Sequence, residues 1–537
     1  MTNQDPAAAL PVDVALVVPA RGLRRWQVAA IRRAEREGIV RVVAVFESGD
    51  TGNSVREGTV ALLSAVESLA SHAGGTPKDD SPPLRERCKA SAEWPDAERP
   101  AANSNGWIQR GRRWSLILNL SAPHLSERMT DLATIGVLEF RIGRTHDIDD
   151  ALECCRLGQD TIALNGVLVG RGGRFVVGHA VAGVRERTMI VTSLELLLAR
   201  ATTVLFRGIR AACGVTPVAS PVPPQRAARP LPPFSARAAA ELVTSAVGDY
   251  ARTARERLRS GMPQWFLAYR ERPEHFVSNA LACSPDGLRV MMPPAGRFFA
   301  DPCVFTHEGT DHVFFEDFDY RSGKGVISWM EHLAPGTFSP PEIVLDREYH
   351  LAYPFVFTAG ADVYMVPETA QTDQIELYRA VSFPRQWERV AVLVQGVRAA
   401  DATLLYEDGR WWMFATVSEG HSSACDELFV FYADALCGPW QPHAANPVKS
   451  DIRSARPAGR FFRHGDLLIR PAQNCSRRYG GSVSLCEVLE LTPDTYRERV
   501  IQELHPGWVP GNARFHTVSA SDHLEFLDGN FSRGCVS

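Results

Sequence analysis

The sequence predicts an α/β domain with a largely parallel sheet, followed by a five-bladed β-propeller. Two observations carry this prediction. Buried-strand runs alternate with helical stretches over the first 210 or so residues, which is typical of α/β domains. The second half repeats one strand–turn–strand unit at intervals of about 50 residues, the period of propeller blades with four strands each.

The α/β domain is expected over residues 1–212. The run "DVALVVPA", the amphipathic stretch "RRWQVAAIRRAERE" and the run "IVRVVAVFES" form a strand–helix–strand unit. Two further strands follow at "WSLILNLS" and "IGVLEFRIG". The glycine-containing "GVLVGRGGRFVVGHA" favours a β-hairpin over a nucleotide loop. Residues 71–106, rich in Pro, Ser, Asp and Lys, predict a mobile surface insertion.

A connection is expected over residues 213–260. Its first part carries seven prolines, which predicts a semi-rigid linker. The alanine-rich stretch 236–258 is expected to be helical. The propeller then occupies 261–537, and its last blade should combine "QWFLAYR" with the C-terminal segment, because such closure ties the ring together.

Four polar or aromatic residues open the propeller repeats. They are Asp301, Tyr353, Asp401 and Arg456. The first strand of each blade lines the central channel, so these side chains should converge on one polar pocket. Glu368, Arg470 and Gln473 are expected in the same pocket, because they lie at or near the ends of repeat strands.

Bulk properties exclude several functional classes. A net charge of −4 over 537 residues gives no support for nucleic-acid binding. The chain has no apolar run of 18 residues and no signal-peptide pattern, so we expect neither a membrane span nor export, and predict a cytoplasmic protein. The 11 cysteines lack metal-ligand spacing, and no cofactor or metal is predicted. The oligomeric state stays open.

The word "FFADPCVF" resembles the first-blade motif of five-bladed arabinanase and xylosidase-type hydrolases. That resemblance implies Asp301 as general base, Asp401 as a second aspartate, and Glu316 or Glu368 as general acid. A glycosidic bond needs such a set, because one carboxylate activates the attacking group and another protonates the leaving oxygen. The alternative is that these residues only cap the channel.

The word "LIRPAQNCSRRYG" predicts a substrate site for an anionic group. With Arg456, it supplies two arginines whose planar forks suit phosphate or carboxylate. The candidate substrate-binding residues are Arg456, Arg470, Gln473, Asn474, Tyr479, Tyr353 and His516. The alternative is that the arginines bond channel carbonyls. For His516, a hydrogen bond is the default, with metal ligation or acid catalysis as alternatives.

The first domain resembles formyltransferase domains, on "DVALVV", "LILNLS", "IGVLEFRIG" and "TSLELLLARATTVLFRGI". The Asn-x-His stretch of that family is missing, and Arg141 stands near the position of its histidine. A guanidinium does not act as a base, so folate-dependent formyl transfer is not expected. Glu139, Arg141 and His146 remain candidate ligand contacts.

Residues 265–530 resemble the propeller domain of plant glucosamine inositolphosphorylceramide transferases and its bacterial relatives. The resemblance rests on "YPFVF", "YMVPET", "DATLLYEDGRWWMF", "RPAG" and "FHT" in this order. It implies carbohydrate or glycoconjugate chemistry. Our first hypothesis is a transferase acting on a small or carrier-linked sugar with an anionic group, with hydrolysis as second choice. The alternatives are a non-catalytic module that binds a glycan or carrier-bound intermediate, and acyl or formyl transfer in the first domain.

Overall fold

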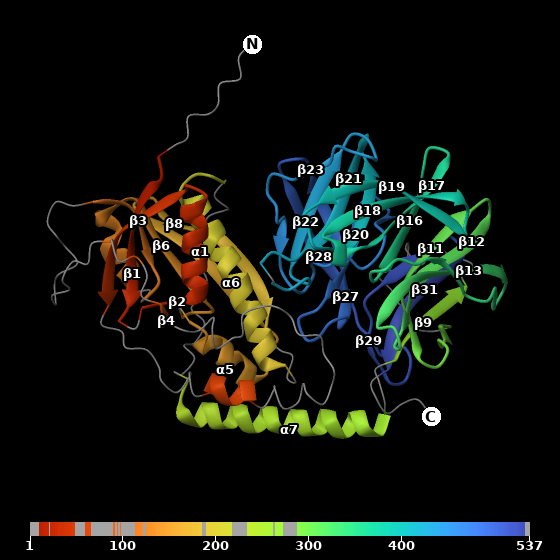
Figure 1. Ribbon diagram of the computed structural model, residues 1–537, viewed down its shortest axis with the longest axis horizontal. Helices are drawn as coiled ribbons and strands as arrows, with labels where there is room; N and C mark the ends of the chain where they lie inside the picture. Colours follow the sequence, from red (N-terminus) through yellow and green to blue (C-terminus); the bar gives the residue numbers. More distant parts are fainter. Residues whose placement is uncertain are drawn as a thin grey trace, which may run out of the picture. The chain divides into compact units, whose positions relative to one another are not determined.

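The computed structural model describes most of both predicted parts of the chain. The described residues are 10–20, 22–48, 59–65, 90–91, 94, 97, 113–121, 125–145, 147–184, 189–216, 234–260, 264–271, 287–420 and 422–531. The chain divides into two compact units (Figure 1). The first comprises Met1–Ala251 together with Gly420–Ser422, and the second comprises Arg252–Glu419 and Ser423–Ser537. Most of the predicted insertion at 71–106, and the proline-rich segment from 217 to 233, lie outside the described residues.

The first unit contains a six-stranded sheet in the order β3-β1-β5-β6-β7-β8. Its strands are β1 (Val12–Pro19), β3 (Val40–Ser48), β5 (Trp114–Asn119), β6 (Ala133–Ile142), β7 (Thr161–Gly170) and β8 (Gly173–Gly183). The short strands β2 (Leu23–Arg24) and β4 (Ala90–Ser91) pair with each other. The helices include α1 (Arg25–Arg36), α4 (Ser126–Met129), α5 (Asp149–Leu157), α6 (Ile190–Ala212) and α7 (Ala236–Ser260), and the last residues of α7 belong to the second unit.

The sheet is mixed, which corrects the expectation of a largely parallel one. The strands from β3 to β6 pair in parallel, whereas β7 and β8 pair antiparallel. The turn of the β7–β8 hairpin lies between Gly170 and Gly173, so the predicted hairpin is confirmed. Helices α1 and α6 share one core with the sheet, and α1 buries Trp26, Ala30 and Ile31 on its apolar face as predicted. None of the described helices is long and apolar enough to cross a lipid bilayer.

The second unit is a five-bladed propeller. The first four blades follow the chain, and each begins with its innermost strand or segment. Blade 1 contains β11 (Arg297–His307), β12 (Thr310–Asp319), β13 (Lys324–Ala334), β14 (Thr337–Phe338) and β15 (Glu342–Leu345). Blade 2 contains β16 (Ala352–Ala359), β17 (Asp362–Glu368), β18 (Gln374–Ser382) and β19 (Gln386–Gln395).

Blades 3 and 4 repeat this pattern. Blade 3 contains β20 (Ala399–Glu407), β21 (Arg410–Val417), β22 (Glu427–Ala433), β23 (Gln441–Pro442) and β24 (Lys449–Ser450). Blade 4 contains β25 (Phe462–His464), β26 (Leu467–Asn474), β27 (Ser482–Leu491) and β28 (Tyr496–Leu504).

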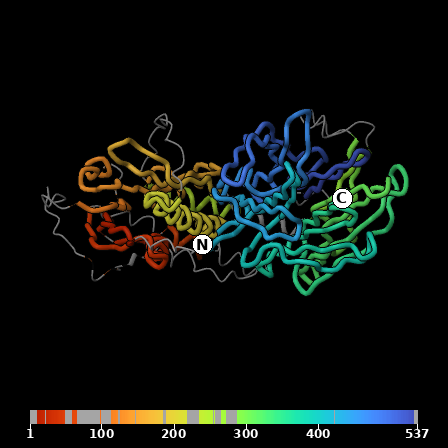
Figure 2. Tube along the Cα trace, turned by 90° about the horizontal axis from the view of Figure 1, so that it is seen from above, coloured from red at the N-terminus to blue at the C-terminus, as the bar shows by residue number. Residues whose placement is uncertain are grey.

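The fifth blade joins the two ends of the propeller segment. It contains β9 (Gln264–Glu271), β10 (Arg289–Met291), β29 (Asn512–Arg514), β30 (Val518–Ala520) and β31 (Leu524–Phe531). Strand β31 pairs antiparallel with β9 along its whole length, from Leu524–Glu271 to Phe531–Gln264. Figure 2 shows the blue C-terminal strands returning beside the green start of the ring. The predicted five-bladed closure is therefore confirmed.

Apolar side chains fill the space between each pair of neighbouring blades. Five separate clusters of buried residues join blade 1 to 2, 2 to 3, 3 to 4, 4 to 5 and 5 back to 1. Trp411 and Trp412 are consecutive on β21 and point to opposite faces. Trp411 packs on the cluster between blades 2 and 3, and Trp412 lies in that between blades 3 and 4. Both tryptophans therefore pack between blades.

The inner strands of three blades share a backbone irregularity. Asp301, Tyr353 and Asp401 have positive φ values of 52°, 43° and 55°. Each lies where the register between first and second strand shifts, as in a β-bulge. A left-handed backbone costs a residue with a side chain on the order of 1–3 kcal/mol. The surrounding structure therefore has to hold these three residues in place.

Truncation after Pro510 should unfold the whole propeller. The cut removes β29, β30 and β31, and leaves β9 without its antiparallel partner. The cluster between blades 4 and 5 loses Phe515, Val518 and Leu527, and the cluster between blades 5 and 1 loses Leu524 and Phe526. One face of blade 4 is therefore uncovered, and one face of blade 1 is partly uncovered. We expect the truncated chain to lose the cooperative thermal transition of the propeller in differential scanning calorimetry. A soluble truncation product with a cooperative propeller transition would contradict the closure argument.

Candidate functional site

The residues that open the repeats meet in the interior of the propeller. Tyr353 of blade 2 reaches blade 3, where its hydroxyl lies 2.8 Å from Thr403 Oγ1. The same hydroxyl accepts the backbone N–H of Gly459 in blade 4 at 2.8 Å. Asp401 of blade 3 is paired with Arg456 of blade 4. Polar contacts thus join the inner ends of blades 2, 3 and 4.

Asp401 is the acceptor for two side chains. Arg456 donates to both of its oxygens, from Nε at 2.6 Å and from Nη2 at 3.0 Å. Gln473 donates to Oδ2 at 2.7 Å. Arg456 also lies 3.5 Å from Glu368. Asp401, Arg456, Gln473 and Glu368 therefore form one group, in which a single guanidinium serves two carboxyl groups.

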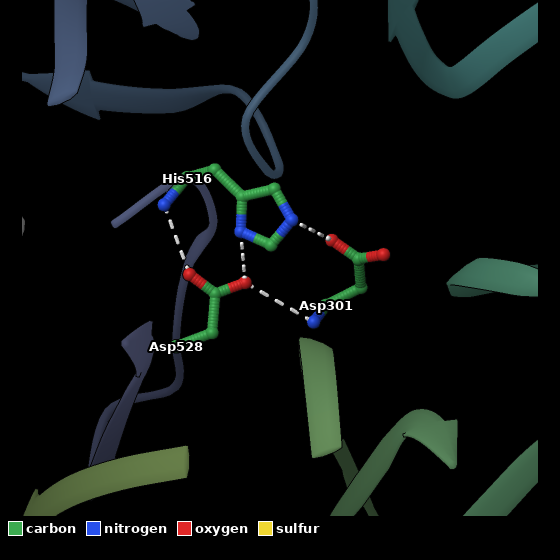
Figure 3. Close-up of side chains that lie close together, drawn as sticks. All are labelled: Asp301, His516 and Asp528. Atoms are coloured by element: carbon green, nitrogen blue, oxygen red, sulfur yellow. Dashed lines mark hydrogen bonds and ion pairs between the residues drawn. The ribbon is translucent and has the colours of Figure 1, made fainter. Parts of the chain in front are cut away.

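A second group surrounds Asp301 (Figure 3). Asp528 on β31 accepts the backbone N–H groups of Asp301, His516 and Thr517 at 3.2, 2.9 and 3.0 Å. Its side chain lies 2.5 Å from Nδ1 of His516, whose Nε2 faces Asp301 Oδ1 at 3.5 Å. Thr517 donates to Asp301 Oδ1 at 2.8 Å. Asp528 thereby holds the N–H of the strained Asp301 and orients the imidazole beside it.

Aromatic rings pack against both groups. The Trp265 ring lies against His516 at a tilt of 33°, with centroids 4.3 Å apart, and Tyr479 meets the same imidazole edge-on at 5.2 Å. The guanidinium of Arg456 lies over the Tyr479 ring at 5.2 Å. Tyr479 is 37% exposed, whereas His516 is buried. Tyr479 therefore lies between the buried polar groups and solvent.

Burial and crowding raise the pKa values of three carboxyl groups. Burial raises the pKa of Glu368 to about 8, against the opposing effect of Arg456. Burial also raises the pKa of Asp301 to about 6 and that of Glu316 well above its usual range. Neighbouring carboxylates, Asp301 and Glu368 among them, add to the effect on Glu316. Glu316 has His350 Nε2 at 3.4 Å.

His516 is held between two carboxylates. Burial opposes its charged form, but Asp528 and Asp301 outweigh that effect and raise the pKa of the imidazole. Asp301, His516 and Asp528 also have the side-chain types of a cation site, with candidate atoms within 4.8 Å of one another. Because each ring nitrogen already faces a carboxylate, a protonated imidazole satisfies this arrangement without a metal.

Two predicted site residues lie elsewhere. Arg470 is 1% exposed and pairs with Glu498 at 2.7 Å, while Nη2 also donates to the Ser454 carbonyl at 2.6 Å. Its fork is filled by blade 4 itself, so the expectation that it lines a common pocket is wrong. Asn474 donates to Glu503 at 2.9 Å, away from the group around Asp401. Both lie an odd number of residues from Gln473, so on a strand they face the other way.

Three residues of the polar groups were not predicted from the sequence. They are Asp528, Thr517 and Trp265, all in blade 5. Thr517 follows directly after the predicted His516, so the word "FHT" was a usable signal. Asp528 and Trp265 carry no such signal, because blade 5 is assembled from the two ends of the propeller segment and departs from the repeat.

The propeller segment is similar to a described protein family. Residues 277–506 match the family model "Glucosamine inositolphosphorylceramide transferase 1, N-terminal". The chain is 36% identical over 233 residues to glucosamine inositolphosphorylceramide transferase 1 of Oryza sativa subsp. japonica, covering 42% of this chain and 31% of that protein. With the protein of that name from Arabidopsis thaliana it is 32% identical over 206 residues, covering 38% and 27%. The chain thus spans about a third of the length of these relatives.

Two solved structures of carbohydrate hydrolases show weaker likenesses. Zg3597, a family 117 glycoside hydrolase of Zobellia galactanivorans, is 11% identical with a TM-score of 0.33, over 51% of this chain and 92% of that chain. The catalytic domain of the Coprinopsis cinerea GH62 α-L-arabinofuranosidase is 13% identical with a TM-score of 0.33, over 44% and 92%. Likenesses of this strength say nothing about a site or a reaction.

Glu368→Gln should stabilise the fold in alkaline solution. The folded pKa of about 8 lies above the usual 4.5, so the folded chain holds this proton more tightly than the unfolded chain. The unfolding free energy contributed by Glu368 therefore falls as pH rises through this window, by about 1.4 kcal/mol per pH unit at most. Glutamine does not ionise, so the melting temperature of E368Q should exceed that of wild type increasingly from about pH 5 to about pH 8.5.

Glu388→Gln is the matched control, because Glu388 is an exposed carboxylate paired with Arg379 on blade 2. Its melting temperature should track wild type at every pH. An E368Q difference that stays constant over the pH range would show that Glu368 titrates normally in the folded chain.

Proposed function

We propose that the propeller is the working part of a carbohydrate-active enzyme, a transferase that acts on a sugar or glycoconjugate bearing an anionic group. The observation that carries the proposal is the pair of polar groups around Asp301 and Asp401, with Glu368 beside Arg456. Separate environments give these carboxyl groups different proton affinities. Such a division is what general acid–base chemistry at a sugar requires.

The proposed roles follow from protonation. Glu368, with a pKa of about 8, is protonated at neutral pH and is the proposed general acid. Asp301 is the proposed base for the acceptor hydroxyl. The acceptor oxygen forms a bond to the anomeric carbon of an activated sugar donor, and the bond from that carbon to the leaving oxygen breaks. The acceptor proton goes to Asp301, and Glu368 supplies a proton to the leaving oxygen.

The anionic group of the substrate is proposed to meet arginines near Tyr479. Arg477 and Arg478 are exposed and precede Tyr479 directly. Arg456 itself is occupied, because its fork serves Asp401, Glu368 and the Ala424 carbonyl. The matched relatives are named for glucosamine and inositolphosphorylceramide, and a sugar acceptor with a phosphoryl group agrees with this arrangement. That this chain belongs to the family of those relatives is part of the proposal.

One observation favours a second function, a module that binds a glycan or carrier-bound intermediate without catalysis. Asp401 is tied to Arg456 by two hydrogen bonds and to Gln473 by a third. A carboxylate held in this way positions other groups and is not itself free to react. Acyl or formyl transfer in the first unit has no comparable support, because the Arg141 guanidinium is paired with Glu139 and is not a base.

The proposal is tested with the purified chain, a panel of nucleotide sugars, and acceptors with and without a phosphoinositol group, followed by mass spectrometry of the products. Asp301→Asn should abolish transfer and leave the melting temperature unchanged or higher, because it removes a buried carboxyl group. A purely structural Asp301 predicts instead a loss of about 1–3 kcal/mol of stability. Glu388→Gln serves as the control with unchanged transfer.

Binding separates the two candidate functions. If the wild-type chain binds a donor or acceptor in calorimetry but forms no product, the binding module is the correct reading. If neither binding nor product is seen with any member of the panel, both candidates fail for these substrates. The double variant R477A/R478A should weaken binding of the phosphoinositol acceptor by about tenfold or more and leave neutral acceptors unchanged.

A further inference from the structure

A buried carboxylate in the first unit is shared by two arginines. Glu139 on β6 is fully buried, and its Oε2 accepts the Ser126 hydroxyl at 2.8 Å. Its Oε1 accepts Arg141 Nη2 at 2.6 Å and also Arg174 Nη2. Asn119 donates to Ser126 Oγ at 2.9 Å and completes this set, called here the Glu139 cluster.

The Glu139 cluster lies where sheets of this kind bind ligands. Asn119 ends β5, and Glu139 and Arg141 lie close to the carboxyl end of β6. The chain passes from β1 to β3 on one side and places β5 on the other, so the strand order reverses between β1 and β5. Open α/β sheets bind ligands outside the carboxyl ends of their strands at such a reversal. The cluster is one strand away from it.

The charges of the cluster are incompletely matched. Two guanidinium groups donate to a single carboxylate oxygen, and the further partner of Arg174 is Glu127, which is largely exposed and 3.4 Å away. Arg141 Nε is buried and has no hydrogen-bond partner. A buried donor without a hydrogen-bond partner is destabilising. The Arg141 side chain is still 27% exposed, so part of it can be reached from solvent.

Polar side chains continue from Arg141 across the neighbouring strands. Arg141 pairs in register with Asn165 on β7, and Asn165 pairs with His179 on β8. His179 Nδ1 lies 2.8 Å from Asn165 Oδ1, in an exposed position. Residues in register on neighbouring strands share one face of the sheet. Arg141 thus begins a polar row that includes a titratable imidazole.

We propose that Arg141 and Arg174 form a binding site for an oxyanion, the phosphate or carboxylate group of a small molecule. The anion accepts hydrogen bonds from the part of the Arg141 guanidinium that solvent reaches and from the remaining donors of Arg174. Glu139 acts as a positioning residue. Its carboxylate accepts a hydrogen bond from each guanidinium group and neutralises one of their two positive charges. A planar guanidinium fork matches phosphate and carboxylate alike. The site is independent of the function proposed for the propeller.

The experiment titrates the full chain calorimetrically with inorganic phosphate and, in a second arm, with malonate, at constant ionic strength. Arg141→Ala should weaken binding of the recognised anion by about tenfold or more, and Arg141→Lys by severalfold, because an ammonium keeps the charge without the fork. Arg171→Ala is the matched control, an exposed arginine of the same unit paired with Asp131, and should change nothing. If Arg141→Ala weakens the binding of phosphate, the ligand group is a phosphate. If it weakens the binding of malonate, the ligand group is a carboxylate.

Glu139→Gln gives a test with the opposite sign. Removing the carboxylate frees both guanidinium groups, so the anion should bind at least about threefold more tightly. A cluster that only supports the fold predicts loss of stability and no gain in binding. The proposal is overturned if neither probe binds, or if wild type, R141A and R141K bind both probes equally, since any such binding then belongs to other arginines.

Discussion

The interior of the propeller holds more carboxyl groups than cations, and this imbalance governs how its centre is built. Among the described residues, the carboxyl groups are Asp301, Glu316, Glu368, Asp401 and Asp528, and the cations beside them are Arg456 and His516. Buried carboxylates without a partner are costly, so protons take the place of the missing cations. The shared Arg456 and the doubly flanked imidazole follow from this shortage, and so do the raised pKa values of Glu316 and Glu368.

The repeat made the propeller and part of its centre predictable. Equivalent positions of successive blades lie around one axis, so the spacing predicted that Asp401 and Arg456 lie near each other, but it did not predict their ion pair. The prediction for Arg470 was wrong because the residues of the segment "LIRPAQNCSRRYG" were assumed to lie on one surface. Successive residues of a strand point to opposite faces of the sheet. The role of Asp528 could not be predicted from the repeat spacing, because blade 5 is assembled from segments that are far apart in the sequence. Left-handed backbone at Asp301 was equally hidden, since no glycine marks the bulge.

The first unit shows a different limit of sequence reasoning. Short apolar runs bounded by turns look alike in parallel and antiparallel strands, so the antiparallel pairing of β6 with β7 was missed although the β7–β8 hairpin was expected. Glu139, Arg141 and His146 were named as possible ligand contacts, and His146 lies outside the described residues. The dependence of the other two on Arg174 was not visible. That arginine lies two strands away from Glu139 in the sheet, and only the antiparallel pairing of β6, β7 and β8 brings it near.

The position of Asp528 on β31 ties the order of synthesis to the assembly of the polar centre. The ribosome makes β31 after the other strands of the ring. This strand pairs with β9, and it also supplies the Asp528 carboxylate that contacts Asp301 and His516. A nascent chain that has completed four blades therefore carries an open ring and an unsupported, strained Asp301. The polar centre assembles only when the propeller closes. An incomplete or proteolysed chain therefore lacks both the closed propeller and the assembled polar centre.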